Sequence, residues 1–91
     1  MRLKWSRSAI GDLARLHAFL APVNPTAATR LMGRLKQAPK MLQVEPRLGA
    51  SLLEFAPREV RRMLVDDYEL RYEVADDLVI VLRLWHTRED R

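Results

Sequence analysis

Residues 68–90 read YELRYEVADDLVIVLRLWHTRED, and their pattern decides the fold. In the first part every second residue is apolar and the residues between are charged, which predicts a strand with one solvated face. The apolar positions are Tyr68, Leu70, Tyr72 and Val74. Residues 78–85 are apolar on both faces except at Arg83, which is typical of a strand inside a sheet. Asp76-Asp77 predicts a turn, because aspartate side chains hydrogen-bond the local backbone.

The sequence before this stretch adds a third strand to the same sheet. Residues 60–65 are mostly apolar and are followed by Asp66-Asp67, which predicts another turn. The loop that precedes them is marked by Pro46, Gly49 and Pro57. We expect the apolar residues within 52–55 to cover one end of the core. The C-terminal third is therefore predicted to form three antiparallel strands.

The chain begins with a predicted strand and helix. Residues 2–5 alternate between basic and apolar side chains, which predicts a short strand. Ser6 or Ser8 can then accept a hydrogen bond from the first free amides of a helix. The apolar residues that follow have the three- and four-residue spacing of one buried helix face, and Pro22 ends the pattern.

A second helix is predicted directly after the first. Asn24 is placed as its N-cap and Pro25 at its first position, where the missing amide costs nothing. Pro39 lies within the pattern and predicts a kink or a break into a short final turn. Apolar residues keep helical spacing as far as Leu42, which favours the kink. The order of strand, helix, helix and three strands predicts an α+β fold, in which an antiparallel two-helix hairpin packs on a small antiparallel sheet.

Composition narrows the class of protein. The 91 residues are enough for a single domain, 1–91, with one small core. The net charge is +4, and thirteen of the 16 basic residues are arginine, whose planar fork suits phosphate and carboxylate partners. Cysteine is absent, and no apolar run is long enough for a signal peptide or a membrane span. We therefore expect a cytoplasmic protein that does not bind membranes.

No pattern of metal-binding residues stands out. Asp66-Asp67 and Asp76-Asp77 are explained by turn formation, and no further histidine or glutamate lies at ligand spacing. His17 lies on the first helix and is expected to pack at the margin of the core. The sequence also lacks a Ser-His-Asp arrangement and a glycine-rich phosphate loop. We expect neither a metal nor a cofactor.

Several short motifs follow one another along nearly the whole chain. They are Trp5 in the opening strand, the helix hairpin, Glu45-Pro46-Arg47-Leu48-Gly49, Arg61-Arg62, the segment Tyr68 to Val74, and the closing segment Trp85 to Asp90. In this order and spacing the chain resembles the RelE/ParE superfamily of bacterial toxins. The resemblance implies a helix hairpin packed on one sheet, and a toxin that a cognate antitoxin wraps and neutralises.

The resemblance implies one of two mechanisms. ParE-like members bind and poison DNA gyrase, whereas RelE-like members are ribosome-dependent mRNA endonucleases. RNA cleavage through the 2′-hydroxyl needs a base, an acid and cations. The candidates for those roles are Arg61, Arg71, Arg83 and His86. However, Glu69 and Thr87 stand where the ribonuclease branch has an arginine and a tyrosine. The sequence therefore favours a non-enzymatic gyrase inhibitor, with the endonuclease acting on ribosome and mRNA as the alternative.

Two binding surfaces are predicted near the C-terminal end. The charged and aromatic segment 83–91 is the candidate target-binding surface. Its candidate contacts are Arg83, Trp85, His86 and Arg88. The antitoxin is expected on a face of the sheet, because a covering peptide with apolar anchors and acidic side chains would suit it. The residues expected on that face are Met63, Arg71, Val81, Arg83 and Trp85.

Overall fold

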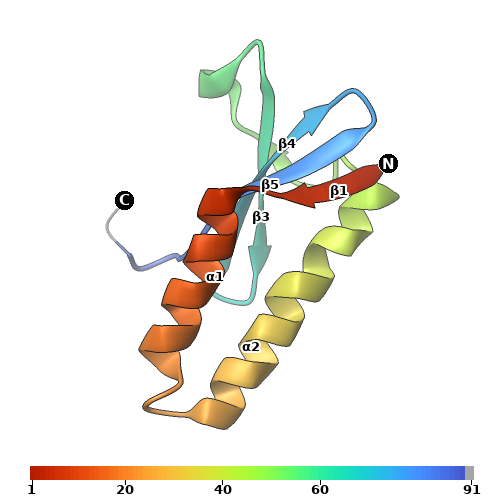
Figure 1. The fold of residues 1–91 in the computed structure, drawn as a ribbon. Coiled ribbons are helices and arrows are strands. Elements are labelled where there is room, and N and C mark those ends of the chain that lie inside the picture. Colours follow the sequence, from red (N-terminus) through yellow and green to blue (C-terminus); the bar gives the residue numbers. More distant parts are fainter. Residues whose placement is uncertain (90–91) are drawn as a thin grey trace.

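Two helices lie side by side across one face of a five-stranded sheet in the computed structural model, which describes residues 1–89 (Figure 1). The elements are β1 (Arg2–Trp5), α1 (Arg7–Leu20), α2 (Pro25–Gln37), the 3₁₀ helix η1 (Ala38–Gln43), β2 (Ala50–Ser51), the 3₁₀ helix η2 (Leu53–Phe55), β3 (Glu59–Val65), β4 (Tyr68–Ala75) and β5 (Leu78–His86). This is the predicted α+β architecture. Within the described residues, no helix is both long and apolar enough to cross a membrane.

The strands are arranged in the order β1-β5-β4-β3-β2. The neighbours from β5 to β2 are antiparallel, as predicted for the C-terminal third. β1 instead runs parallel to β5, with Leu3 opposite Val79 and Trp5 opposite Val81. The sheet is therefore mixed at this edge rather than antiparallel throughout. A parallel pair needs a long connection, which the helices and the other strands supply here.

The core lies between the helices and the sheet. The predicted alternation in β4 is confirmed, since every second residue from Leu70 to Val74 is buried and joins the cluster that includes the helices. β5 is an interior strand, also as predicted, and contributes three buried side chains to the same cluster. The cluster comprises Ala9, Leu13, Leu16, Leu31, Leu35, Leu42, Val65, Leu70, Tyr72, Val74, Val79, Val81 and Leu84.

Side-chain caps fix where both helices begin. The hydroxyl of Ser6 accepts a hydrogen bond from the amide of Ala9 at 2.9 Å and donates one to the carbonyl of Leu82 at 2.8 Å. Asn24 caps α2 by accepting from the amide of Ala27 at 3.0 Å. Each cap satisfies one of the free amides of its helix, and both predicted starts are confirmed.

The α-helix ends just before Pro39, so the favoured kink is wrong and the alternative, a break into a short final turn, is confirmed. α2 ends at Gln37, and the chain continues as η1, in which Pro39 and Leu42 are buried. Proline has no amide to donate to the preceding turn, and the tighter 3₁₀ turn keeps the apolar side chains against the core. Apolar spacing is retained in either arrangement, so it could not distinguish a kink from a change of helix type.

A buried tyrosine holds the loop that precedes β3. The hydroxyl of Tyr72 accepts a hydrogen bond from the amide of Gly49 at 2.9 Å and donates one to the carbonyl of Pro46 at 2.8 Å. Burial raises the pKa of Tyr72, so the hydroxyl stays protonated and remains a donor. This side chain therefore connects the centre of the sheet to the loop.

A buried carboxylate joins α1 to β5. Asp12 is the buried charged residue of the described chain, and it accepts from Nε and Nη2 of Arg83 at 2.9 and 3.1 Å. It also accepts from the amide of Leu84 at 2.9 Å, and Arg15 lies 3.7 Å away. Burial alone would raise the pKa of Asp12. The hydrogen bonds from Arg83 and Leu84 and the charges of both arginines outweigh burial, so the pKa is lowered.

The contact with Asp12 lies at a β-bulge. The register of β5 against β4 shifts at Leu82, which has no partner in the β4 ladder. A bulge of this kind changes which face of the sheet the later residues occupy. Val81 and Leu84 are both buried in the core although they are three positions apart. Trp85, which follows them, consequently faces away from the helices.

Gly49→Ala tests the contact between the loop and Tyr72. A β-carbon at Gly49 would lie 2.9 Å from the Tyr72 hydroxyl and still closer to the carbonyl of Arg62. We expect this variant to lose about 1–3 kcal/mol of unfolding free energy, as overpacking does, in urea denaturation. Gly11→Ala is the control, because its β-carbon would meet nothing within 4 Å. Equal stability of the two variants would contradict the predicted clash.

Asp12→Asn tests the link between α1 and β5. Asparagine keeps the shape but removes the charge that pairs with Arg83, and we expect the unfolding free energy at pH 7 to fall by about 1–3 kcal/mol. A carboxyl whose pKa is lowered by folding stabilises the protein above its unfolded pKa, and this contribution is lost as the pH falls through the folded value. The difference between the native chain and the variant should therefore shrink below about pH 4 in urea titrations.

The control for this measurement is Asp77→Asn. It removes an ion pair with Arg2 in which both side chains are mostly exposed. Exposed pairs contribute about 0–1 kcal/mol, so this variant should lose little stability at any pH. A stability difference for Asp12→Asn that stays constant from pH 7 to pH 3 would show that the charge of Asp12 is not what stabilises the link.

Candidate functional site

A stacked arginine lies on the face of the sheet opposite the helices. The guanidinium of Arg71 lies between two rings, 5.3 Å from the centroid of Phe55 and 4.8 Å from that of Trp85. Cation–π contacts of this kind contribute roughly 0.5–2 kcal/mol each. We expected 52–55 to cover one end of the core. Instead Phe55 packs on this face, and Leu53 is exposed.

Glu69 pairs with two arginines beside this stack. Its carboxylate accepts from Nη1 of Arg62 at 3.2 Å and from Nη2 of Arg71 at 3.3 Å. Leu64, opposite Glu69 in the β3–β4 ladder, is 58% exposed. We name this surface the open face, and it consists of Phe55, Arg62, Leu64, Glu69, Arg71 and Trp85. It combines apolar contacts with cations whose charge Glu69 partly balances.

The residues predicted to bind the antitoxin do not all share one face. Arg71 and Trp85 meet on the open face. Val81 is fully buried in the core, and Met63 packs against that core from β3. Their placement corrects the predicted set. Strict alternation along β5 would put Val81 and Trp85 on the same face, and the bulge at Leu82 breaks that alternation.

The four residues considered for RNA cleavage are held in separate contacts. Arg83 is paired with the buried carboxylate of α1, and Arg71 is stacked on the open face. Arg61 donates at 2.8 Å to a neighbouring carboxylate and at 2.8 Å to a loop carbonyl. His86 packs against Tyr68 on the helix side of the sheet. These side chains are therefore directed at different surroundings and not at one phosphate position.

The two acidic pairs form turns, as predicted. Asp66 and Asp76 have positive φ angles of 54° and 55°, a conformation that aspartate tolerates in tight hairpin turns. Across residues 1–89, no group of three or more His, Cys, Asp or Glu side chains is placed to hold a metal ion. The expectation that the protein uses no metal and no cofactor stays a prediction.

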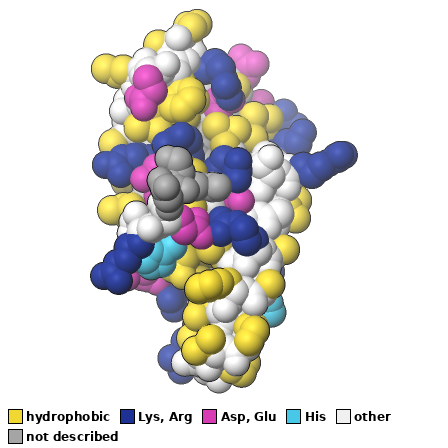
Figure 2. All heavy atoms as spheres, turned by 90° about the vertical axis from the view of Figure 1, so that its left-hand side faces the viewer, with side chains coloured by type: hydrophobic (Ala, Val, Ile, Leu, Met, Phe, Trp, Pro, Cys, Tyr) yellow, Lys and Arg dark blue, Asp and Glu magenta, His cyan; other side chains and the backbone are white. Residues whose placement is uncertain are grey.

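A pocket opens between the end of α1 and the ends of β4 and β5. We name it the C-terminal pocket, and its volume is about 480 Å³. It is lined by Arg15, Leu16, Phe19, Tyr68, His86, Arg88 and Glu89. Figure 2 shows this side of the molecule, where a histidine side chain lies beside basic, acidic and apolar side chains. The pocket therefore offers several kinds of contact within a small space.

Ring contacts and an ion pair shape the C-terminal pocket. His86 meets Tyr68 edge-on, with 5.0 Å between the ring centroids, and its Nδ1 accepts from the amide of Arg88 at 3.0 Å. Arg15 forms an ion pair with Glu89. Burial and then the charge of Glu89 raise the pKa of Tyr68, so its hydroxyl stays protonated.

The predicted target-binding residues are divided between two faces. His86 and Arg88 line the C-terminal pocket. Trp85 lies on the open face, and Arg83 is paired with Asp12. The predicted segment extends to residue 91, but residues 90 and 91 lie outside the described part of the chain.

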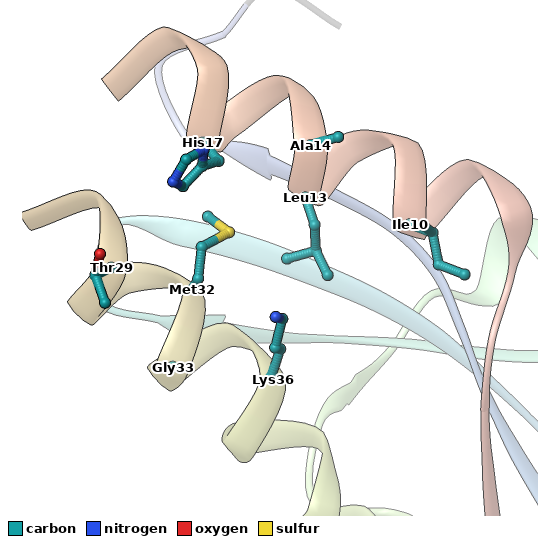
Figure 3. Close-up of a pocket in the computed structure, with 8 residues that line it drawn as sticks. All are labelled: Ile10, Leu13, Ala14, His17, Thr29, Met32, Gly33 and Lys36. Atoms are coloured by element: carbon teal, nitrogen blue, oxygen red, sulfur yellow. The ribbon is translucent and has the colours of Figure 1, made fainter. Parts of the chain in front are cut away.

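A larger groove lies between the two helices, and the sequence did not reveal it (Figure 3). Its volume is about 710 Å³, and it is lined by Ile10, Leu13, Ala14, His17, Thr29, Met32, Gly33 and Lys36. We expected His17 at the margin of the core, whereas it lines this groove. The sequence feature that could have revealed the groove is a second stripe of side chains along α1, at positions 10, 13, 14 and 17, beside the buried stripe. The mostly apolar lining of the groove would suit the apolar face of an amphipathic helix.

Comparison with known proteins identifies the family. Residues 3–91 match the family described as ParE toxin of type II toxin-antitoxin system, parDE. A relative named Toxin RelE2, from Caulobacter vibrioides (strain ATCC 19089 / CIP 103742 / CB 15), is 35% identical over 82 residues, which cover 90% of each chain. A solved structure, the chromosomal ParDE TA system from P. aeruginosa, has the same fold, with a TM-score of 0.79, 24% identity, and coverage of 94% of this chain and 95% of that one. The chain therefore belongs to the ParE toxin family of type II toxin-antitoxin systems.

Proposed function

We propose that this chain is a single-domain toxin, 1–91, that acts in the cytoplasm by binding DNA gyrase. The toxin role follows from its family, the ParE toxins of type II toxin-antitoxin systems. Membership of such a system implies a cognate antitoxin. The parDE description of the family supports gyrase as the target. The observation that weighs most is that the candidate RNA-cleaving side chains are held in separate contacts.

Binding rather than hydrolysis follows from the arrangement of charged groups. Cleavage through the 2′-hydroxyl needs a base, an acid and cations directed at one phosphate. Arg83 is neutralised by a buried carboxylate, and Glu69 adds a negative charge beside Arg71. Such an arrangement disfavours the extra negative charge of a phosphorane. We therefore infer that the toxin acts by occupying a surface of its target.

We place the target-binding surface around the C-terminal pocket. Phe19 is 82% exposed at its rim, and Arg88 is exposed beside it. Exposed aromatic and arginine side chains concentrate binding energy at interfaces. His86 contributes a polar group to the same surface. Arg83 is not part of it, because its guanidinium is used to hold α1 against β5.

We place the antitoxin on the open face. Trp85 and Leu64 offer apolar contacts there, and Arg62 and Arg71 offer cations. An antitoxin segment with apolar anchors and acidic side chains would complement this combination. The groove between the helices is the competing surface, because it suits an amphipathic helix and is mostly apolar.

Ribosome-dependent cleavage of mRNA is the second candidate function. Two observations favour it, namely the relative named Toxin RelE2 and the contact between His86 and Tyr68. A histidine and a tyrosine side by side can transfer protons. Cations for the phosphate would then have to come from Arg15 or Arg88 in the C-terminal pocket.

Two assays on the free toxin decide the target. We expect the toxin to inhibit supercoiling by gyrase and to accumulate cleaved DNA complexes, while mRNA on translating ribosomes stays intact. Arg88→Ala should weaken gyrase inhibition about tenfold or more, since it removes a charge-assisted contact. Arg30→Ala, an exposed arginine of α2, is the matched control and should have no effect. Cleaved mRNA with unaffected gyrase would overturn the gyrase proposal.

Trp85→Ala tests the antitoxin surface. Loss of an aromatic anchor typically costs about 2 kcal/mol or more, so antitoxin affinity should fall about 30-fold in titration calorimetry. Val23→Ala, which replaces an 83% exposed residue between the helices, should leave the affinity unchanged. Ile10→Ala probes the groove between the helices. If Ile10→Ala weakens binding and Trp85→Ala does not, the antitoxin binds in the groove and not on the open face.

A further inference from the structure

The residues that follow β5 are folded back by hydrogen bonds from their own amides. We name Thr87, Arg88 and Glu89 the C-terminal turn. Thr87 donates to the carbonyl of Asp67 at 2.9 Å, and Glu89 donates to the carbonyl of His86 at 2.9 Å. Arg88, between them, donates to Nδ1 of His86 at 3.0 Å. None of these three bonds reaches α1, so the position of the C-terminal turn against α1 depends on side chains.

The guanidinium of Arg15 joins α1 to the C-terminal turn. Nη1 forms an ion pair with Oε1 of Glu89. Nη2 donates to the carbonyl of Leu84 at 3.3 Å and lies 3.7 Å from Oδ1 of Asp12. The hydrogen bond with Glu89 is the main cause that raises the pKa of Arg15, ahead of the charge of Asp12. One side chain therefore connects α1, β5 and the C-terminal turn.

This connection determines which side chains meet in the C-terminal pocket. Phe19 lies one helical turn after Arg15, on the same face of α1. Because Arg88 directly precedes Glu89, the ion pair between Arg15 and Glu89 brings Arg88 to the side of α1 where Phe19 lies, and both line the pocket. The guanidinium of Arg88 is exposed and forms no ion pair with another residue of 1–89. It therefore remains available to a partner.

We propose that Arg15 and Glu89 are positioning residues, which hold Arg88 beside Phe19 for contact with the target. Arg15 acts through Glu89, and Glu89 acts through Arg88. The carboxylate of Glu89 faces inward, since its side chain is 29% exposed and Oε2 is buried. This placement suits a contact within the chain better than a contact with a partner. The inference rests on the proposed function, because Phe19 and Arg88 belong to the proposed target-binding surface.

Such positioning matters because a partner would otherwise have to order the turn when it binds. A turn held only by its own amides samples several conformations, and the loss of that freedom on binding reduces the affinity. The ion pair adds little to global stability, since the side chain of Arg15 is 42% exposed. The pair is therefore better suited to ordering the C-terminal turn than to stabilising the whole fold.

Amide hydrogen exchange of the full chain, followed by NMR, measures the order of the turn. Glu89→Gln keeps the shape of the side chain and removes its charge. We expect the amides of residues 88 and 89 to exchange about three- to tenfold faster in this variant. Glu73→Gln is the matched control, because Glu73 pairs with Arg58 outside the pocket, and it should leave these rates unchanged. Equal rates in the native chain and in Glu89→Gln would contradict the proposal.

The role of Arg15 is tested by combining variants. Arg15→Gln should speed exchange in the turn as Glu89→Gln does, and the double variant should exchange no faster than either one. Arg15→Lys keeps the positive charge and should have a smaller effect than Arg15→Gln. Urea unfolding of each variant separates a loss of local order from a loss of the fold. Additive effects of Arg15→Gln and Glu89→Gln would show that the two residues act independently.

Gyrase inhibition tests whether the pair acts through Arg88. Glu89→Gln should weaken inhibition about three- to tenfold in the native chain and should have no further effect in Arg88→Ala. Equal weakening in both backgrounds would overturn this inference and leave gyrase as the target. If gyrase is spared and mRNA is cleaved, the same pair of backgrounds is compared in the cleavage assay. Loss of the proposed target and loss of this inference are therefore separate results.

Discussion

The ion pair between Asp12 and Arg83 is the contact on which both candidate surfaces depend. By accepting also from the amide of Leu84, Asp12 fixes α1 against β5 at the bulge. Beyond the bulge, Leu84 is in the core, Trp85 lies on the open face and His86 lines the C-terminal pocket. Desolvation opposes a buried ion pair, so its net stabilisation is small, but its geometry is specific. Here it accompanies the register in which Trp85 lies on the open face and His86 lines the C-terminal pocket.

Most of the arginines form ion pairs with other residues of the same chain. Ion pairs with aspartate or glutamate hold Arg2, Arg15, Arg34, Arg47, Arg58, Arg61, Arg62, Arg71 and Arg83. Exposed pairs of this kind contribute only about 0–1 kcal/mol each. Figure 2 shows the consequence, since acidic side chains lie among the basic ones across one side of the molecule. The net charge of +4 therefore overstates the free cationic surface, and recognition falls on few side chains.

Local patterns predicted most of the fold, because each depends on neighbours in the sequence. The alternation in β4 and the caps Ser6 and Asn24 are of this kind. The parallel pairing of β1 and the bulge at Leu82 depend instead on distant contacts, such as that between Asp12 and Arg83, which are 71 positions apart. No local pattern contains such a contact. For this reason the sequence could propose candidate site residues but could not predict the face that each occupies.

The separation of the two surfaces constrains how an antitoxin could cover both. The C-terminal pocket is built on the first residue of β4, Tyr68, and on the last of β5, His86, which are paired. Trp85 lies one residue earlier on the open face, and β3 and β2 lie on one side of this pair. A segment that went around one edge would have to cross β3 and β2, and on the other side, where β1 ends opposite Val81, it would meet α1, whose Asp12 accepts from the amide of Leu84. The shorter route from the open face to the pocket passes over the ends of β4 and β5, beside the turn at 66–67 and residues 87–89.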